Sequence, residues 1–139
     1  VQHLKQPEGH VERLKSAFEM LEEKPQPKPC KGMKGLIEEG QETIDDHEGD
    51  GEAADLALIA AAQKVEHYEI AGYGTVRSLA RQIGEREIAT LLSRTLGEEE
   101  SSDYLLTELS KPSMQDASST HNKAAKVTQS PKTQTRNRD

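Results

Sequence analysis

The sequence predicts an all-α protein built as an antiparallel helical bundle, and three observations support this fold class. Apolar residues make up 32% of the 139 positions, aromatic residues only 3%, and tryptophan is absent. Such a composition disfavours a sandwich or a barrel, because strands are enriched in β-branched and aromatic residues. Alanine, leucine, glutamate, lysine and glutamine dominate instead, and all of them favour helices. Apolar residues also recur at helical spacings of three and four.

Two shorter helices are expected first. One covers residues 8–23, begins beside Pro7, which a first helical turn tolerates, and ends before three closely spaced prolines. The other covers residues 31–46. The apolar stripe of the first consists of Val11, Leu14, Phe18 and Leu21, and that of the second of Met33, Leu36, Ile37 and Ile44.

Two long helices follow, over residues 53–83 and 85–110. Gly84 between them suits a left-handed helix cap, and Pro112 marks the expected end of the second. We therefore assign residues 1–110 to an antiparallel bundle. Residues 111–139 are rich in Ser, Thr, Gln, Asn and Lys, and we expect them to form a disordered tail.

The charge is divided between these two regions. Residues 1–110 contain 12 Lys/Arg and 23 Asp/Glu, a net charge of −11, whereas residues 111–139 have a net charge of +4. An acidic body attracts cations and repels nucleic acid and anionic membranes. We expect metal ions as partners, and neither nucleic acid nor membrane, although the basic tail leaves weak nucleic-acid contact as a minor alternative.

The sequence also bears on the cellular compartment of the protein and on whether the chain is complete. Cys30 is the only cysteine, so no internal disulfide can form, which suits a reducing, cytoplasmic compartment. No apolar run approaches the roughly 20 residues that a membrane-spanning helix needs. The chain begins with Val1 rather than methionine, and we expect it to be part of a longer protein.

Carboxylates interrupt the apolar stripes of both long helices. In the third helix the acids are Glu66 and Glu69, three residues apart and therefore on one face. In the fourth they are Glu99 and Asp103. The stripe of the third helix is Leu58, Ala62, Val65, Glu69, Gly72, Val76, Leu79 and Ile83, and that of the fourth is Ile88, Leu92, Leu96, Glu99, Asp103, Leu106 and Leu109.

Two interpretations of these acids remain open. A buried carboxylate must be paired, protonated or bound to metal, and neither stripe contains a Lys or Arg to pair with it. Divalent cations between the helices would remove the repulsion, and an oxygen-rich site suits iron or manganese. Alternatively, the acids lie at the edge of the bundle and reach solvent, as some of Glu98, Glu99 and Glu100 must.

Three stretches resemble the YciE/YciF ferritin-like family. Residues 55–75 read DLALIAAAQKVEHYEIAGYGT, residues 30–39 read CKGMKGLIEE, and residues 92–109 carry its pattern of leucines and acids. The resemblance implies a ferritin-like four-helix bundle whose first family helix is missing here. It also implies a di-iron site of carboxylates and histidines and a role in the stress response.

The resemblance also extends the set of candidate ligands to the first expected helix. The family has a carboxylate where this chain has Lys5, and no proline at the position of Pro7, so Glu8 is the remaining acid, with His10 a weaker candidate. The candidate metal ligands are therefore Glu66, Glu69, Glu99, Asp103 and Glu8.

Two functions follow as hypotheses. The first is an iron protein, with manganese as an alternative metal, whose site oxidises Fe(II) in a ferroxidase-like reaction during stress protection. The second is a metal-free helical interaction module, in which the groove left by the missing helix is filled by a partner helix or by a second copy of the chain, giving a homodimer.

Overall fold

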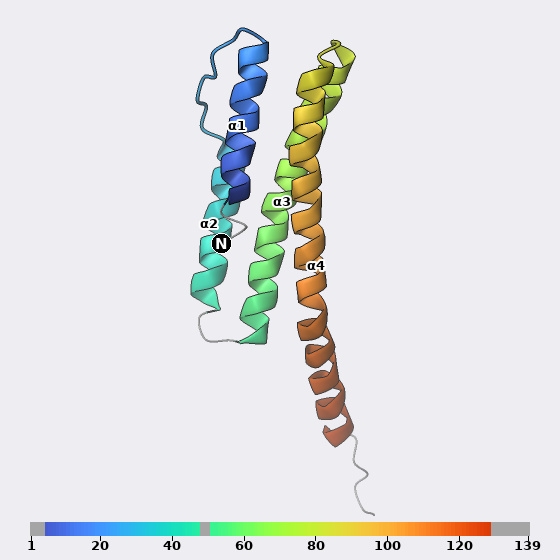
Figure 1. Cartoon of the computed structure of the whole chain (residues 1–139). Helices are drawn as coiled ribbons and strands as arrows, with labels where there is room; N and C mark the ends of the chain where they lie inside the picture. The colour runs from blue at the N-terminus through green and yellow to red at the C-terminus, as the bar shows by residue number, and fades with distance from the viewer. Residues whose placement is uncertain (1–4, 48–50, 129–139) are drawn as a thin grey trace, which may run out of the picture.

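The computed structural model describes residues 5–47 and 51–128, and this part of the chain contains helices and no strands. The helices are α1 (Lys5–Met20), α2 (Lys31–Asp46), α3 (Glu52–Gln82) and α4 (Arg86–Thr128). Figure 1 shows them as an elongated set of side-by-side rods. The all-α prediction is confirmed, and each helix begins within three residues of its expected start.

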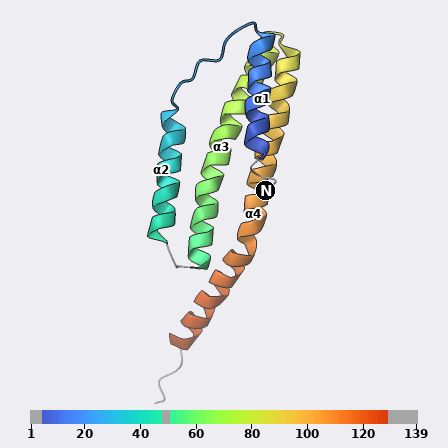
Figure 2. The same ribbon diagram turned by 60° about the vertical axis from the view of Figure 1, so that its left-hand side comes forward.

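An antiparallel hairpin of α3 and α4 forms the centre of the fold. The backbone of α1 approaches only α4, and that of α2 approaches only α3. The two short helices cover opposite ends of the hairpin, with α1 near the α3–α4 turn and α2 near the start of α3 (Figures 1 and 2). Helix α1 begins near the middle of the hairpin and runs toward the α3–α4 turn (Figures 1 and 2).

The turn between α3 and α4 depends on Gly84. Its φ of 91° lies in the left-handed region, and its N–H donates to the carbonyl of Arg81. The N–H of Glu85 donates to the carbonyl of Ala80, which completes the paired hydrogen bonds of a Schellman cap. A residue with a Cβ is strained at such a φ.

We expect Gly84→Ala to lower the free energy of unfolding by about 1 kcal/mol, through backbone strain alone. An added Cβ would meet no atom within 4 Å there. Gly74 lies inside α3 and is equally unobstructed, so Gly74→Ala should raise stability by about 0.5–1 kcal/mol. Urea denaturation of both variants checks this, and shifts of the same sign would contradict it.

The packed core is small and made largely of alanine. It joins α1, α3 and α4 through Ala17, Ala80, Ile88, Ala89 and Leu92, with Leu14 and Tyr73 packed against it. Small residues let the helices approach closely, but they bury little apolar area. Because the backbones of α1 and α3 stay apart, the ring of Tyr73 fills part of the space between them.

The predicted apolar stripe of α3 is wrong in part, whereas that of α4 is buried from Ile88 to Glu99. Four of the five leucine, valine and isoleucine members of the α3 stripe are 47–70% exposed, Leu58, Val76, Leu79 and Ile83, whereas Val65 is half-buried. The packed face of α3 is rotated and uses Ala61 and Ala80 instead. The spacing of apolar residues identified a stripe on α3, but the neighbouring helices pack against a different face of this helix.

The predicted end of the last helix at Ser110 is also wrong. Helix α4 continues through Pro112 to Thr128 and projects beyond α2 and α3 (Figure 1). Proline removes one helical hydrogen bond, yet the following residues include alanine, glutamine and lysine, which favour helix. The expected disorder is thus replaced by helix up to Thr128, and residues 129–139 lie outside the described part. The division into a bundle and a tail at residue 110 stays a prediction.

Among the described residues, no helix is long and apolar enough to cross a membrane.

Candidate metal centre

Three of the predicted acids meet between α3 and α4. One carboxylate oxygen from each of Glu66, Glu69 and Glu99 lies within 4.8 Å of the other two. Glu99 is only 4% exposed, and the two acids of α3 are partly buried. The solvent-facing interpretation therefore does not describe Glu99, although it does describe its exposed neighbour Glu100.

Two oxygens of this cluster are buried without a hydrogen-bond partner, Oε2 of Glu66 and Oε1 of Glu99. Burial, followed by the charges of Glu69 and Glu66, raises the pKa of Glu99 from 4.5 to about 8. Burial and the charge of Glu66 likewise raise the pKa of Glu69. Without a cation, the cluster therefore holds protons that isolated carboxylates would release at neutral pH.

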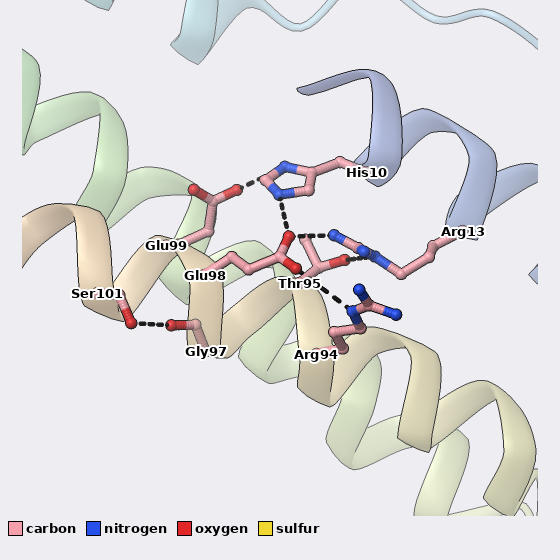
Figure 3. A network of polar contacts seen from close by, with 8 residues as sticks. All are labelled: His10, Arg13, Arg94, Thr95, Gly97, Glu98, Glu99 and Ser101. Atoms are coloured by element: carbon pink, nitrogen blue, oxygen red, sulfur yellow. Dashed lines mark hydrogen bonds and ion pairs between the residues drawn. The ribbon is translucent and has the colours of Figure 1, made fainter. Parts of the chain in front are cut away.

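Helix α1 places His10 beside Glu98 and Glu99 of α4, as Figure 3 shows. The Nδ1 atom of His10 lies 3.0 Å from Oε1 of Glu99, and its Nε2 atom lies 2.9 Å from Oε2 of Glu98. The Nδ1 contact is close enough for an ion pair, but it lacks the alignment of a hydrogen bond, so Oε1 remains unsatisfied. His10 is thus placed to orient Glu99.

An arginine holds the other side of this network. Arg13 pairs with Glu98, and its Nε donates to Oγ1 of Thr95 at 2.8 Å (Figure 3). Burial alone would raise the pKa of Glu98, but the hydrogen bonds from Arg13 and His10 outweigh burial and lower it. Glu98 therefore stays ionised and serves as an anchor for α1 rather than as a member of the cluster.

The remaining predicted ligands lie outside the cluster. Asp103 accepts from Nε2 of Gln63 at 3.0 Å and lies 3.2 Å from Nε2 of His67. Glu8 is exposed at the start of α1. The structure thus brings together three of the five predicted ligands and adds His10 beside them.

The donor set fits one divalent cation. Three carboxylates with two unsatisfied oxygens, and an imidazole 3.0 Å from one of them, make an oxygen-rich site with one nitrogen, which suits iron or manganese. A second ion would need further carboxylates, and the described residues place none within this group.

Comparison with known proteins agrees with this fold. The family model described as "Domain of unknown function (DUF892)" matches residues 1–130. Protein YciF of Escherichia coli (strain K12) is 49% identical over 108 residues, which are 77% of this chain and 64% of YciF. The chain thus spans less than two thirds of the length of that relative.

Two solved structures are similar as well. The crystal structure of the E. coli stress protein YciF superposes with a TM-score of 0.77 and 46% identity, covering 82% of this chain and 72% of that one. YcfI from Rhodopseudomonas palustris superposes with a TM-score of 0.72 and 38% identity, covering 76% and 67%. These matches confirm the resemblance seen in residues 30–109.

Proposed function

This chain belongs to the DUF892 family, and on that premise we propose that it is a ferritin-like protein that binds a divalent metal ion. Iron is the first candidate and manganese the second. The ligands are Glu66, Glu69 and Glu99, with His10 beside them. A two-iron centre, which the family resemblance implies, would need ligands beyond this cluster.

The observation that carries the proposal is the pair of unsatisfied, buried oxygens in the carboxylate cluster. A buried polar atom without a partner costs about 1–3 kcal/mol, and more when it is charged. In the metal-free protein a proton held by Glu99 relieves this arrangement in part, and a divalent cation would relieve it more fully. Within the described residues, no Lys or Arg forms an ion pair with any of the three acids; Arg13 pairs with Glu98 and Lys64 with Glu39 instead.

The residues around the cluster have separable roles. Nδ1 of His10, 3.0 Å from Oε1 of Glu99, would be placed to take up a proton that Glu99 releases, and Nε2 would then donate to Glu98. Arg13 holds Glu98 in place and so fixes the imidazole. Bound iron would supply one-electron redox chemistry, and a ferroxidase-like role in stress protection is the extension that the relative's description as a stress protein supports.

We expect the purified chain to retain about one Fe(II) or Mn(II) per molecule after anaerobic loading and desalting. Glu69→Ala should lose the metal and keep its helical content, because it removes a ligand and relieves repulsion. Glu100→Gln, an exposed neighbour, should retain it. Elemental analysis and circular dichroism check this, and equal metal content in both variants would contradict the site. Admitting air to the iron-loaded protein then tests oxidation.

A second candidate function is a metal-free interaction module, for which the exposed apolar side chains of α3 provide an observation. Val76, Leu79 and Ile83 are 49–70% exposed, more than an isolated bundle needs to leave uncovered. Sedimentation equilibrium with and without chelator distinguishes the two functions. A homodimer that ignores chelator, in a chain that retains no metal, would favour the second.

A further inference from the structure

An open cavity of about 340 Å³ lies beside the carboxylate cluster, lined by residues of α1, α2, α3 and the first half of α4. Its wall is almost entirely apolar and aromatic: Leu14, Met33, Tyr68, Tyr73, Val76 and Leu92. Gly72 contributes bare backbone to the wall. Apolar cavities of this size with few polar groups are typical of small-molecule sites.

Among the described residues that line this cavity, Cys30, Tyr68, Tyr73 and Glu69 carry polar side-chain groups. The Sγ atom of Cys30 and the hydroxyl of Tyr68 lie 2.9 Å apart and hydrogen-bond each other. Glu69 is the single charged residue in the wall, and within the described residues no hydrogen bond or ion pair occupies its carboxylate. The cavity therefore presents one free, strong acceptor in otherwise apolar surroundings.

We propose that this cavity binds a small neutral aromatic alcohol, whose ring lies among the tyrosine and methionine side chains and whose hydroxyl donates to Glu69. Aromatic rings pack well against Tyr68 and Tyr73, and the thioether of Met33 makes favourable contacts with rings. A hydroxyl donor satisfies the carboxylate without burying a second charge. Binding of the alcohol to this cavity needs no metal. The proposed function bears only on whether the bound alcohol lies next to a metal ion.

The alternatives have the wrong chemistry for this space. An anionic ligand would be repelled by the three neighbouring carboxylates. An ammonium ion would be attracted to them, but it would lose its hydration in an apolar wall that offers one acceptor for three N–H groups. A purely apolar ligand would gain no hydrogen bond from Glu69.

Gly72 allows the cavity to be filled without disturbing the fold. A Cβ added there meets no atom within 4 Å, so Gly72→Met should extend into the cavity and leave the helix intact. Gly74→Met is the matched control, because Gly74 is equally unobstructed on the same helix but does not line this cavity. Glu69→Leu removes the acceptor and keeps a side chain of similar size.

Isothermal titration of the metal-free full chain with p-cresol, toluene and benzylamine tests the proposal. We expect one p-cresol to bind, roughly tenfold or more tighter than toluene, which is the gain expected from a hydrogen bond to a charged acceptor. Gly72→Met should weaken binding at least about tenfold, Gly74→Met should not, and Glu69→Leu should abolish the preference for p-cresol over toluene.

The proposal is overturned if p-cresol does not bind, if toluene binds equally well, if benzylamine binds more tightly, or if Gly72→Met binds like the parent chain. Metal content of the Gly72→Met variant is measured separately. Loss of p-cresol binding with normal metal uptake supports the cavity, whereas p-cresol binding in a chain that takes up no metal overturns the proposed function alone.

Discussion

Replacing Glu99 by glutamine is expected to weaken metal binding by more than about 100-fold and, at pH 8, to stabilise the metal-free protein. Loss of a residue that only supports a metal ligand typically lowers metal affinity 10–100-fold. Glu99 is proposed as a ligand itself and is the most buried of the three, so its loss should cost more. The amide cannot supply an anionic oxygen to a cation. It can, however, donate an N–H to the unsatisfied Oε2 of Glu66.

The gain in stability should depend on pH with a definite sign. In the folded protein, burial and the charges of Glu69 and Glu66 raise the pKa of Glu99 from 4.5 to about 8. Between these values the unfolded chain releases a proton that the folded chain retains, so the free energy of unfolding falls as pH rises through this window. Glutamine does not titrate, and the variant should therefore lack this decline.

Urea denaturation in chelator at pH 4.5 and pH 8 measures this difference. We expect similar stabilities at pH 4.5 and an advantage for Glu99→Gln of about 2 kcal/mol or more at pH 8. Glu100→Gln is the control for removing one negative charge, because Glu100 is exposed. An advantage of the same size in the control, or lower stability of Glu99→Gln at pH 8, would show that the cluster is not electrostatically unfavourable.

The carboxylate cluster was predictable because burial of acids is visible in a helical pattern. Glu69 and Glu99 interrupt apolar stripes, and the antiparallel pairing of α3 with α4 places them opposite each other. Asp103 follows the same pattern by sequence but lies one turn farther along α4, where Gln63 and His67 satisfy it. Periodicity places a residue on a face, and it does not say which partner that face meets.

The anchoring of α1 was harder to predict. Arg13 and Glu98 are charged residues, which usually face solvent, and their pairing depends on how α1 docks against α4. The available signal was the spacing of His10, Arg13, Leu14 and Ala17, which share one face of α1 at intervals of three and four. The spacing of apolar residues alone predicted a stripe of Val11, Leu14, Phe18 and Leu21, of which Val11 and Leu21 are exposed.

Replacing Arg13 by alanine is expected to release α1 from the hairpin and to lower the free energy of unfolding by about 2–4 kcal/mol at pH 7. The substitution removes the arginine donor from two groups, the partly buried carboxylate of Glu98, which keeps its contacts with His10 and Arg94, and the hydroxyl of Thr95, which is 1% exposed. Besides this pairing, α1 is held by His10 and by the packing of Leu14 and Ala17 against the hairpin.

The effect of Arg13→Ala should also diminish in acid, and this separates charge pairing from packing. The pKa of Glu98 is lowered in the folded protein, so the pairing contributes stability above its ordinary value of 4.5 and is lost as pH falls through the folded pKa. Urea denaturation at pH 7 and pH 3.5 should therefore give a smaller difference between parent and variant at the lower pH.

The control is Lys15→Ala, which removes an exposed pair with Glu12 and should lower the free energy of unfolding by less than about 1 kcal/mol at both pH values. An equal loss for Arg13→Ala at both pH values would mean that the arginine stem, rather than its charge, holds α1 against the site.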